Sequence, residues 1–176
     1  DATHPTFVVR LALPPANAIE AVPPGVVSSW IFGLQAGQSV MLTGPFGDFG
    51  VRDSPREIVL IAGGAGIAPI RSIILDQLSS GTGCKMSFWY GVRNIREICY
   101  EAEFTELAAQ HSNFHWNAAL SEPRSDSSWT GYRGFIHNVV RDNYLDEHPA
   151  PEELDYYLCG PPVMSAAVTK MLLDLG

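Results

Sequence analysis

Apolar side chains follow two periods along most of the chain. Continuous apolar runs of strand length alternate with segments in which apolar positions recur at helical spacing. Such runs are typical of parallel strands buried on both faces, and the helical period is typical of amphipathic helices. The clearest run predicts a strand at 58–62, and β-like segments predict further strands at 85–90, 114–120 and 155–159. The spacing predicts helices at 67–78, 101–110, 134–145 and 161–175. This alternation predicts an α/β fold, in which a parallel sheet has right-handed crossovers and helices on both faces.

The first 54 residues follow a different pattern. Two β-like runs, at 6–13 and 38–43, are separated by prolines and by a segment at 26–34 that predicts one short helix. The stretch 44–50 (GPFGDFG) is rich in turn residues. We expect two domains, a partial antiparallel β-barrel over 1–54 and a parallel-sheet, Rossmann-like domain over 55–176. Because two strands cannot close a barrel, the remaining strands are expected outside this chain, which we interpret as a piece of a longer protein.

The composition argues against several kinds of partner and site. The 176 residues carry 11 Lys and Arg against 19 Asp and Glu, a net charge of −8, which argues against a nucleic-acid partner. No apolar run is long enough to predict a membrane span. The three cysteines are odd in number and sparse, which indicates a reducing compartment, and the histidines show no ligand spacing with them, so no metal site is expected.

A glycine-rich turn, GGAGIAP, follows the first predicted strand and opens a predicted helix. Glycines allow a backbone to approach a pyrophosphate closely, and a helix N-terminus offers unpaired N–H groups. A proline suits the first helical turn, where its missing N–H costs nothing. A tight strand–helix turn without a ligand is an equally good interpretation, because the sequence is not GxGxxG. The candidate residues are Gly63, Gly64, Ala65, Gly66 and Pro69.

A second motif, CGPP, follows the fourth predicted strand and comprises Cys159, Gly160, Pro161 and Pro162. Ligands of open α/β sheets bind at the carboxyl ends of the strands, so we expect Cys159 to share a crevice with the glycine turn. A small polarizable side chain there could pack against a planar ring. A buried structural cysteine before a helix-starting proline pair is the alternative that the single motif favours.

Two further motifs lie at element ends. YGVR supplies Tyr90, Gly91 and Arg93 at the end of the second strand, where the adenosine half of a dinucleotide would sit. Arg93 could bind a phosphate or ribose, or pair with Glu97 four residues later. The helix start at Gly25, Val26, Val27, Ser28 and Ser29 could hold a second phosphate, although an ordinary capped helix fits the spacing better.

In this order, GPFG, GGAGIAP, YGVR and CGPP resemble the ferredoxin–NADP reductase superfamily, in which a flavin-binding barrel precedes a nicotinamide-binding α/β domain. Over residues 7–175 the resemblance narrows to the F subunits of bacterial sodium-translocating NADH:quinone reductases. The segments that narrow it are PPGVVSSWIF, GPFGDF, GGAGIAPIRS, ALSEP, WTGYRGFIHN and YYLCGPPVM.

The resemblance implies an NADH-oxidising flavoprotein enzyme within a membrane respiratory complex, on the cytoplasmic side of the bacterial inner membrane. NADH would pass a hydride to FAD, and electrons would go singly to an iron–sulfur cluster in a preceding domain, then to other subunits and quinone. No side chain would act as acid or base. The resemblance implies that Gly25 to Ser29 bind the FAD pyrophosphate, and that Gly63, Gly64, Gly66 and Pro69 shape the turn that binds the NADH pyrophosphate. Tyr90, Gly91 and Arg93 would lie beside the adenosine. Cys159 and Gly160 would lie beside the nicotinamide.

Several family features are missing from the chain: the flavin-binding R-x-Y-S/T motif, the last strand with its aromatic tail, the C-x4-C-x2-C cluster motif and the N-terminal anchor. Activity is therefore expected only in the full-length protein. Two alternatives stay open, the reductase component of a bacterial oxygenase and a non-catalytic nucleotide-binding module. NADH is expected over NADPH, because Arg93 and Arg96 are the only nearby cations for a 2′-phosphate.

Overall fold

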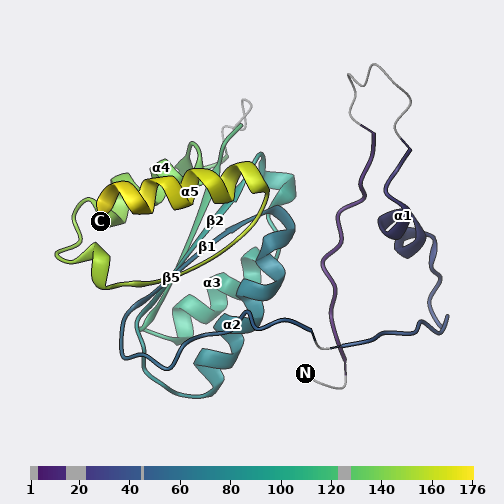
Figure 1. Ribbon diagram of the computed structural model, residues 1–176, viewed down its shortest axis with the longest axis horizontal. Helices are drawn as coiled ribbons and strands as arrows, with labels where there is room; N and C mark the ends of the chain where they lie inside the picture. Colours follow the sequence, from purple (N-terminus) through teal and green to yellow (C-terminus); the bar gives the residue numbers. More distant parts are fainter. Residues whose placement is uncertain (1–3, 15–22, 45, 123–127) are drawn as a thin grey trace. The chain divides into compact units, whose positions relative to one another are not determined.

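The computed structural model describes residues 4–14, 23–44, 46–122 and 128–176. The chain divides into two compact units, Asp1–Phe49 and Gly50–Gly176 (Figure 1), so the boundary falls slightly before the one expected after residue 54. Pro45, in the turn-rich stretch 44–50, lies outside the described residues.

The second unit contains a five-stranded sheet in which every pair of neighbouring strands is parallel. The strand order is β4-β3-β2-β1-β5, so β1 lies between β2 and β5 and all six of its residues are buried. The four predicted strands are confirmed, and β4 is an additional strand of two residues. The strands are β1 (Ile58–Gly63), β2 (Met86–Val92), β3 (Phe114–Leu120), β4 (Tyr132–Arg133) and β5 (Asp155–Cys159).

Helices cover both faces of this sheet. In Figure 1, α4 and α5 lie on one side of the strands and α2 and α3 on the other. The helices are α2 (Ile67–Ser79), α3 (Glu101–Gln110), α4 (Ile136–Val140) and α5 (Pro162–Leu175). Short 3-10 turns, η1 (Gly64–Gly66), η2 (Ile95–Glu97) and η4 (Pro151–Glu153), and a π-helical turn, η3 (Arg141–Leu145), complete the unit.

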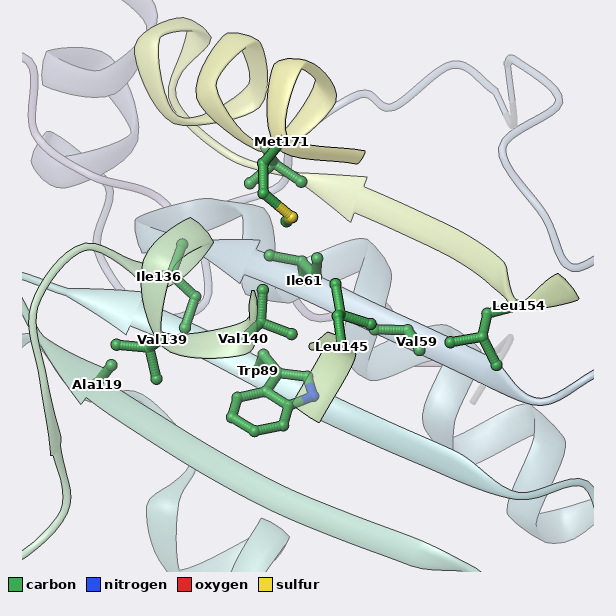
Figure 2. Close-up of a cluster of buried hydrophobic side chains, with 11 residues drawn as sticks. Val59, Ile61, Trp89, Ala119, Ile136, Val139, Val140, Leu145, Leu154 and Met171 are labelled. Carbon is green, nitrogen blue, oxygen red and sulfur yellow. The ribbon is translucent and has the colours of Figure 1, made fainter. Parts of the chain in front are cut away.

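Each face of the sheet has its own core. Under α4 and α5, strand residues Val59, Ile61 and Trp89 pack against helix residues that include Ile136 and Met171 (Figure 2). The opposite face is aromatic, and its rings come from Phe88, Tyr90, Phe104, Phe114 and Trp116. Burial on both faces explains why β1 appears as an uninterrupted apolar run.

One helix prediction needs correction. The predicted helix at 134–145 is α-helical only over Ile136–Val140 and continues as the π-helical turn. In α5, Val163 is 84% exposed, whereas Val168 is fully buried. The helix begins at Pro162, so Val163 lies in its first turn, and the inward face is set by Met164, Val168 and Met171 instead.

The first unit contains the predicted short helix as α1 (Val26–Gly33). The predicted strands at 6–13 and 38–43 are wrong, because neither segment is a hydrogen-bonded strand in the described part of this unit. A strand is stable only when a neighbour pairs with it. Many large apolar side chains are consequently exposed here, among them Phe7, Leu13, Val26, Trp30, Met41 and Phe46.

Among the helices in the described residues, none combines the length and hydropathy needed to cross a bilayer.

Candidate functional site

The carboxyl ends of three strands meet at one edge of the sheet. The register pairs Gly63 of β1 with Gly91 of β2, and Ala62 of β1 with Cys159 of β5. This edge is where open α/β sheets bind their ligands. The structure therefore brings GGAGIAP, YGVR and CGPP together, as their positions after strands predicted.

The glycine turn and the CGPP turn touch through their backbones. A Cβ added at Gly66 would overlap the carbonyl of Cys159 and lie 2.8 Å from the nitrogen of Gly160. A Cβ added at Gly160 would lie 3.1 Å from the nitrogen of Gly63. Two glycines are thus required where the turns pack against each other, which is a close approach within the protein rather than to a ligand.

The glycine turn and the CGPP turn each place a helix N-terminus at this edge. The N-cap of α2 is Gly66 and that of α5 is Pro161, and neither has a side-chain capping bond. The first N–H groups of a helix have no intrahelical partner and carry a partial positive charge, so both helix ends attract anions. Pro69 occupies the first turn of α2 and Pro162 that of α5, where proline fits without loss of a hydrogen bond.

Gly64 differs from the other glycines of the turn. Its φ is +53°, and no atom lies within 4 Å of the position that a Cβ would occupy. The residue is therefore glycine for its backbone conformation, and it leaves open space beside the turn. The neighbouring Ala65 is exposed. This open side is where a ligand could approach the turn.

Tyr90 lies beneath the turn rather than on its surface. Its side chain is fully buried, with its ring 6.0 Å from the rings of both Phe88 and Trp116. Its hydroxyl donates to the carbonyl of Gly64 at 3.0 Å. Burial raises the pKa of Tyr90, so the hydroxyl stays protonated at neutral pH. The expected contact of this side chain with adenosine is corrected, because helices cover both faces of β2.

Gly91 and Arg93 both contact other residues of the protein. A Cβ added at Gly91 would lie 2.8 Å from the Cβ of Ile136, so this glycine makes room for α4. The guanidinium of Arg93 donates to Glu97 at 2.6 and 3.0 Å, which raises the pKa of Arg93. The ion pair that the spacing offered as an alternative is therefore present, and it holds a carboxylate at the end of β2.

Cys159 is half-buried and is a free thiol at the end of β5. Its carbonyl faces Gly66, and Gly160 follows it toward α5. The thioether of Met164, in the first turn of α5, covers the positions where Gly63 and Gly160 would carry a Cβ. The sequence did not indicate that Met164 and Ile136 shape this edge. Their contacts with glycines distant in the chain reveal it.

The start of α1 in the first unit makes hydrogen bonds with a neighbouring segment of its own chain. The hydroxyl of Ser28 donates to the Gly25 carbonyl at 3.1 Å and accepts the N–H of Ala12 at 3.1 Å. The N–H of Gly25 donates to the Ala12 carbonyl at 2.9 Å, and that of Ser29 to the Gly25 carbonyl. Val26 and Val27 are exposed. Any anion at this helix would therefore meet backbone N–H groups rather than the Ser28 hydroxyl.

A polar cluster at the opposite, amino edge of the sheet was also missed. The carboxylate of Glu57 pairs with Lys85 at 3.0 Å and accepts the hydroxyl of Tyr144. A cavity of about 590 Å³ lies beside it and includes Cys84, whose thiol pKa is raised by burial. Within the described residues, no group of three or more His, Cys, Asp and Glu side chains is placed to hold a metal ion.

Comparison with known proteins agrees with this geometry. Residues 60–170 match the family model described as the oxidoreductase NAD-binding domain. The F subunit of the Na(+)-translocating NADH-quinone reductase of Yersinia pestis (strain Pestoides F) is 53% identical over 169 residues. The match covers 96% of this chain and 41% of that protein, so the chain spans less than half the length of this relative.

Two solved structures have the same fold. The Amycolatopsis cytochrome P450 reductase GcoB superposes with a TM-score of 0.76 at 27% identity, over 94% of this chain and 55% of that chain. A ferredoxin NADP+ reductase from Neisseria gonorrhoeae, solved with bound FAD and NADP, gives 0.73 at 20% identity over 88% of this chain and 64% of that chain. The expected fold class and the resemblance found in the motifs are both confirmed.

Proposed function

Because this chain belongs to the family of oxidoreductase NAD-binding domains, we propose that it is the NADH-oxidising module of a flavoprotein reductase. The observation that carries the proposal is the contact of Gly66 with the backbone of Cys159 and Gly160. That contact sets the N-termini of α2 and α5 beside each other at the carboxyl edge of the sheet. A pyrophosphate, with its two negative charges, suits a site of this kind.

The residues present fit a nicotinamide dinucleotide. The open space beside Gly64 leaves room for the pyrophosphate, which would accept N–H groups of the turn Gly63 to Gly66. Arg93 and Gly91 would lie on the adenosine side, and Cys159 with Gly160 on the nicotinamide side. Tyr90 and Pro69 support these positions from within the fold.

In the first unit, the start of α1 is the position at which a flavin would bind. The backbone N–H groups at the helix start, after Gly25, would hold the FAD pyrophosphate, since the Ser28 hydroxyl is already engaged. The two cofactors together supply hydride transfer, and the protein supplies binding and orientation. The chain itself needs no acid or base, so the position of Cys159 and the two turns matter more than any side-chain ionisation.

The identity to the Yersinia F subunit extends the proposal to the whole protein. The intact protein would pass electrons singly to an iron–sulfur cluster outside this chain, and onward to the other subunits of a sodium-translocating complex and quinone, on the cytoplasmic side of the inner membrane. The reductase component of an oxygenase is the second candidate, which the structural likeness to a cytochrome P450 reductase supports. Sodium-dependent quinone reduction by the intact complex would separate the two.

The test is the colour of the purified intact protein. We expect a flavin spectrum that NADH bleaches under anaerobic conditions, with NADPH binding more weakly because the Glu97 carboxylate beside Arg93 would repel a 2′-phosphate. Titrations with both nucleotides measure the preference. A protein without flavin, or one whose flavin NADH leaves oxidised, would favour a non-catalytic nucleotide-binding module. Tighter binding of NADPH would reverse the assigned nucleotide.

Cys159→Ala in the intact protein is expected to slow flavin reduction at saturating NADH by about tenfold, an increase of roughly 1.4 kcal/mol in the barrier. The dissociation constant for NADH should change less, because the pyrophosphate contacts are untouched. Stopped-flow absorbance measures both quantities. Cys84→Ala, at the amino edge, is the matched control and should behave as the unsubstituted protein. An unchanged rate in Cys159→Ala would assign that cysteine to packing alone.

A further inference from the structure

We propose that Tyr90 is a positioning residue, whose hydroxyl holds the turn Gly63 to Gly66 in the conformation that binds the nucleotide pyrophosphate. The inference rests on the proposed function and adds to it a residue that does not itself touch the nucleotide. It follows from one partly buried hydrogen bond and from the geometry of the peptide that the bond anchors.

The anchor is rigid. The Tyr90 ring is fully buried and packs against the rings of both Phe88 and Trp116, which also contact each other. A ring packed in this way cannot follow the turn if the turn moves, so the hydroxyl acts as a fixed point. From that point it donates to the Gly64 carbonyl at 3.0 Å. No atom from elsewhere in the chain lies within 4 Å of the position that a Cβ on Gly64 would occupy, so there is open space beside the residue that the bond anchors.

The bond determines where an N–H group points. The Gly64 carbonyl accepts the Tyr90 hydroxyl and also the N–H of Ile67, at the start of α2. In a trans peptide the C=O and the following N–H point in opposite directions. Anchoring the Gly64 carbonyl inward therefore directs the N–H of Ala65 outward, ahead of the helix. An N–H group in that direction is what an anion at a helix N-terminus accepts.

The same hydroxyl lies between two turns. Its oxygen is 3.5 Å from the carbonyl of Glu97, in the segment that carries the Arg93–Glu97 ion pair. A phenol has one proton to donate, and the shorter distance assigns it to Gly64. Burial raises the pKa of Tyr90, so the donor is not lost by ionisation at neutral pH. Tyr90 thus supports the pyrophosphate side directly and touches the adenosine side of the same edge.

The test compares Tyr90→Phe with Tyr156→Phe in the intact protein. Each variant removes one phenolic hydrogen bond to a backbone carbonyl, since Tyr156 donates to Pro151 at 2.8 Å near the start of β5. We expect Tyr90→Phe to weaken ADP-ribose binding, measured by calorimetry, and to raise the half-saturating NADH concentration, each by about tenfold. The rate of flavin reduction at saturating NADH should stay within about twofold, because the nicotinamide side keeps its contacts.

Equal ADP-ribose binding by Tyr90→Phe and the unsubstituted protein would overturn the proposal. An equal loss of binding in Tyr156→Phe would overturn it as well. Amide hydrogen exchange separates positioning from general loosening: in Tyr90→Phe the amides of residues 64–67 should exchange faster, while those of the β1 strand stay protected. Uniform acceleration would also count against the proposal.

A measurement without substitution covers the case in which Tyr90→Phe does not fold. In the unsubstituted protein the Tyr90 hydroxyl proton should be protected from exchange, and ADP-ribose should shift its NMR resonance. A resonance that ADP-ribose leaves unmoved would overturn the positioning role. If NADH fails to reduce the flavin while ADP-ribose binding still depends on Tyr90, only the proposed redox function fails.

Discussion

Gly66→Ala is expected to destabilise the second unit by about 3 kcal/mol or more, and to abolish nucleotide binding with it. The added Cβ would overlap the carbonyl of Cys159, which is backbone and cannot rotate aside. Cys159 is itself held by the ladder between β1 and β5. The two turns would have to separate, and the helix ends at the carboxyl edge would part. Chemical denaturation of the purified protein measures the loss in the free energy of unfolding.

Gly64→Ala is the control, because it adds the same methyl group to the same turn without a collision. No atom lies within 4 Å of the new Cβ, but the φ of +53° costs an alanine about 1 kcal/mol. We therefore expect a smaller loss of stability than for Gly66→Ala. Equal stability of Gly66→Ala and the unsubstituted protein would show that the two turns need not touch, and it would remove the main support for the proposed site.

Phe104→Ala is expected to cost about 3–5 kcal/mol of unfolding free energy. Phe104 is the buried residue of α3, and its ring lies 4.9 Å from that of Trp116 and 5.0 Å from that of Phe88. Removing it leaves a cavity in the aromatic core under α3 and deprives the helix of its main attachment to the sheet. Denaturant titration measures the loss, and near-ultraviolet circular dichroism reports the loosened rings.

Phe135→Ala is the matched control for this prediction. Phe135 is 64% exposed and its ring stacks on His137 at 6.0 Å, so its truncation should cost less than about 1 kcal/mol. Similar losses in the two variants would mean that the aromatic cluster does not hold α3. Since Phe88 and Trp116 also pack against Tyr90, a loosened core in Phe104→Ala should in addition weaken nucleotide binding.

Local pattern was sufficient for the main elements of the second unit. The predicted bounds of β3, β5 and α3 are those observed, because strand and helix segments alternate at the spacing of a parallel α/β sheet and an amphipathic helix repeats its apolar positions. The inward position of Phe104 follows from the same helical spacing. The Arg93–Glu97 pair is also local, because the short turn η2 directly after β2 brings the two side chains together.

Other elements depend on partners that local pattern does not show. The two residues of β4 form a strand only because they pair with Ala119 and Leu120. The segments 6–13 and 38–43 have β-like composition but no neighbouring strand in the described residues, so they form none. Tyr90 could be assigned to the end of a strand, but its burial was decided by the helices that cover both faces of that strand.

From its sequence alone, this chain specified a parallel α/β domain with three chemical motifs at the ends of its strands. Tertiary structure alone decided what each glycine is for. An absent Cβ is visible in a sequence, but what fills its place comes from elements distant in the chain. Gly66 meets the Cys159 carbonyl, Gly91 meets Ile136, and Gly64 faces open space. The physical reason is that close packing is a property of facing surfaces, which only the completed fold brings together.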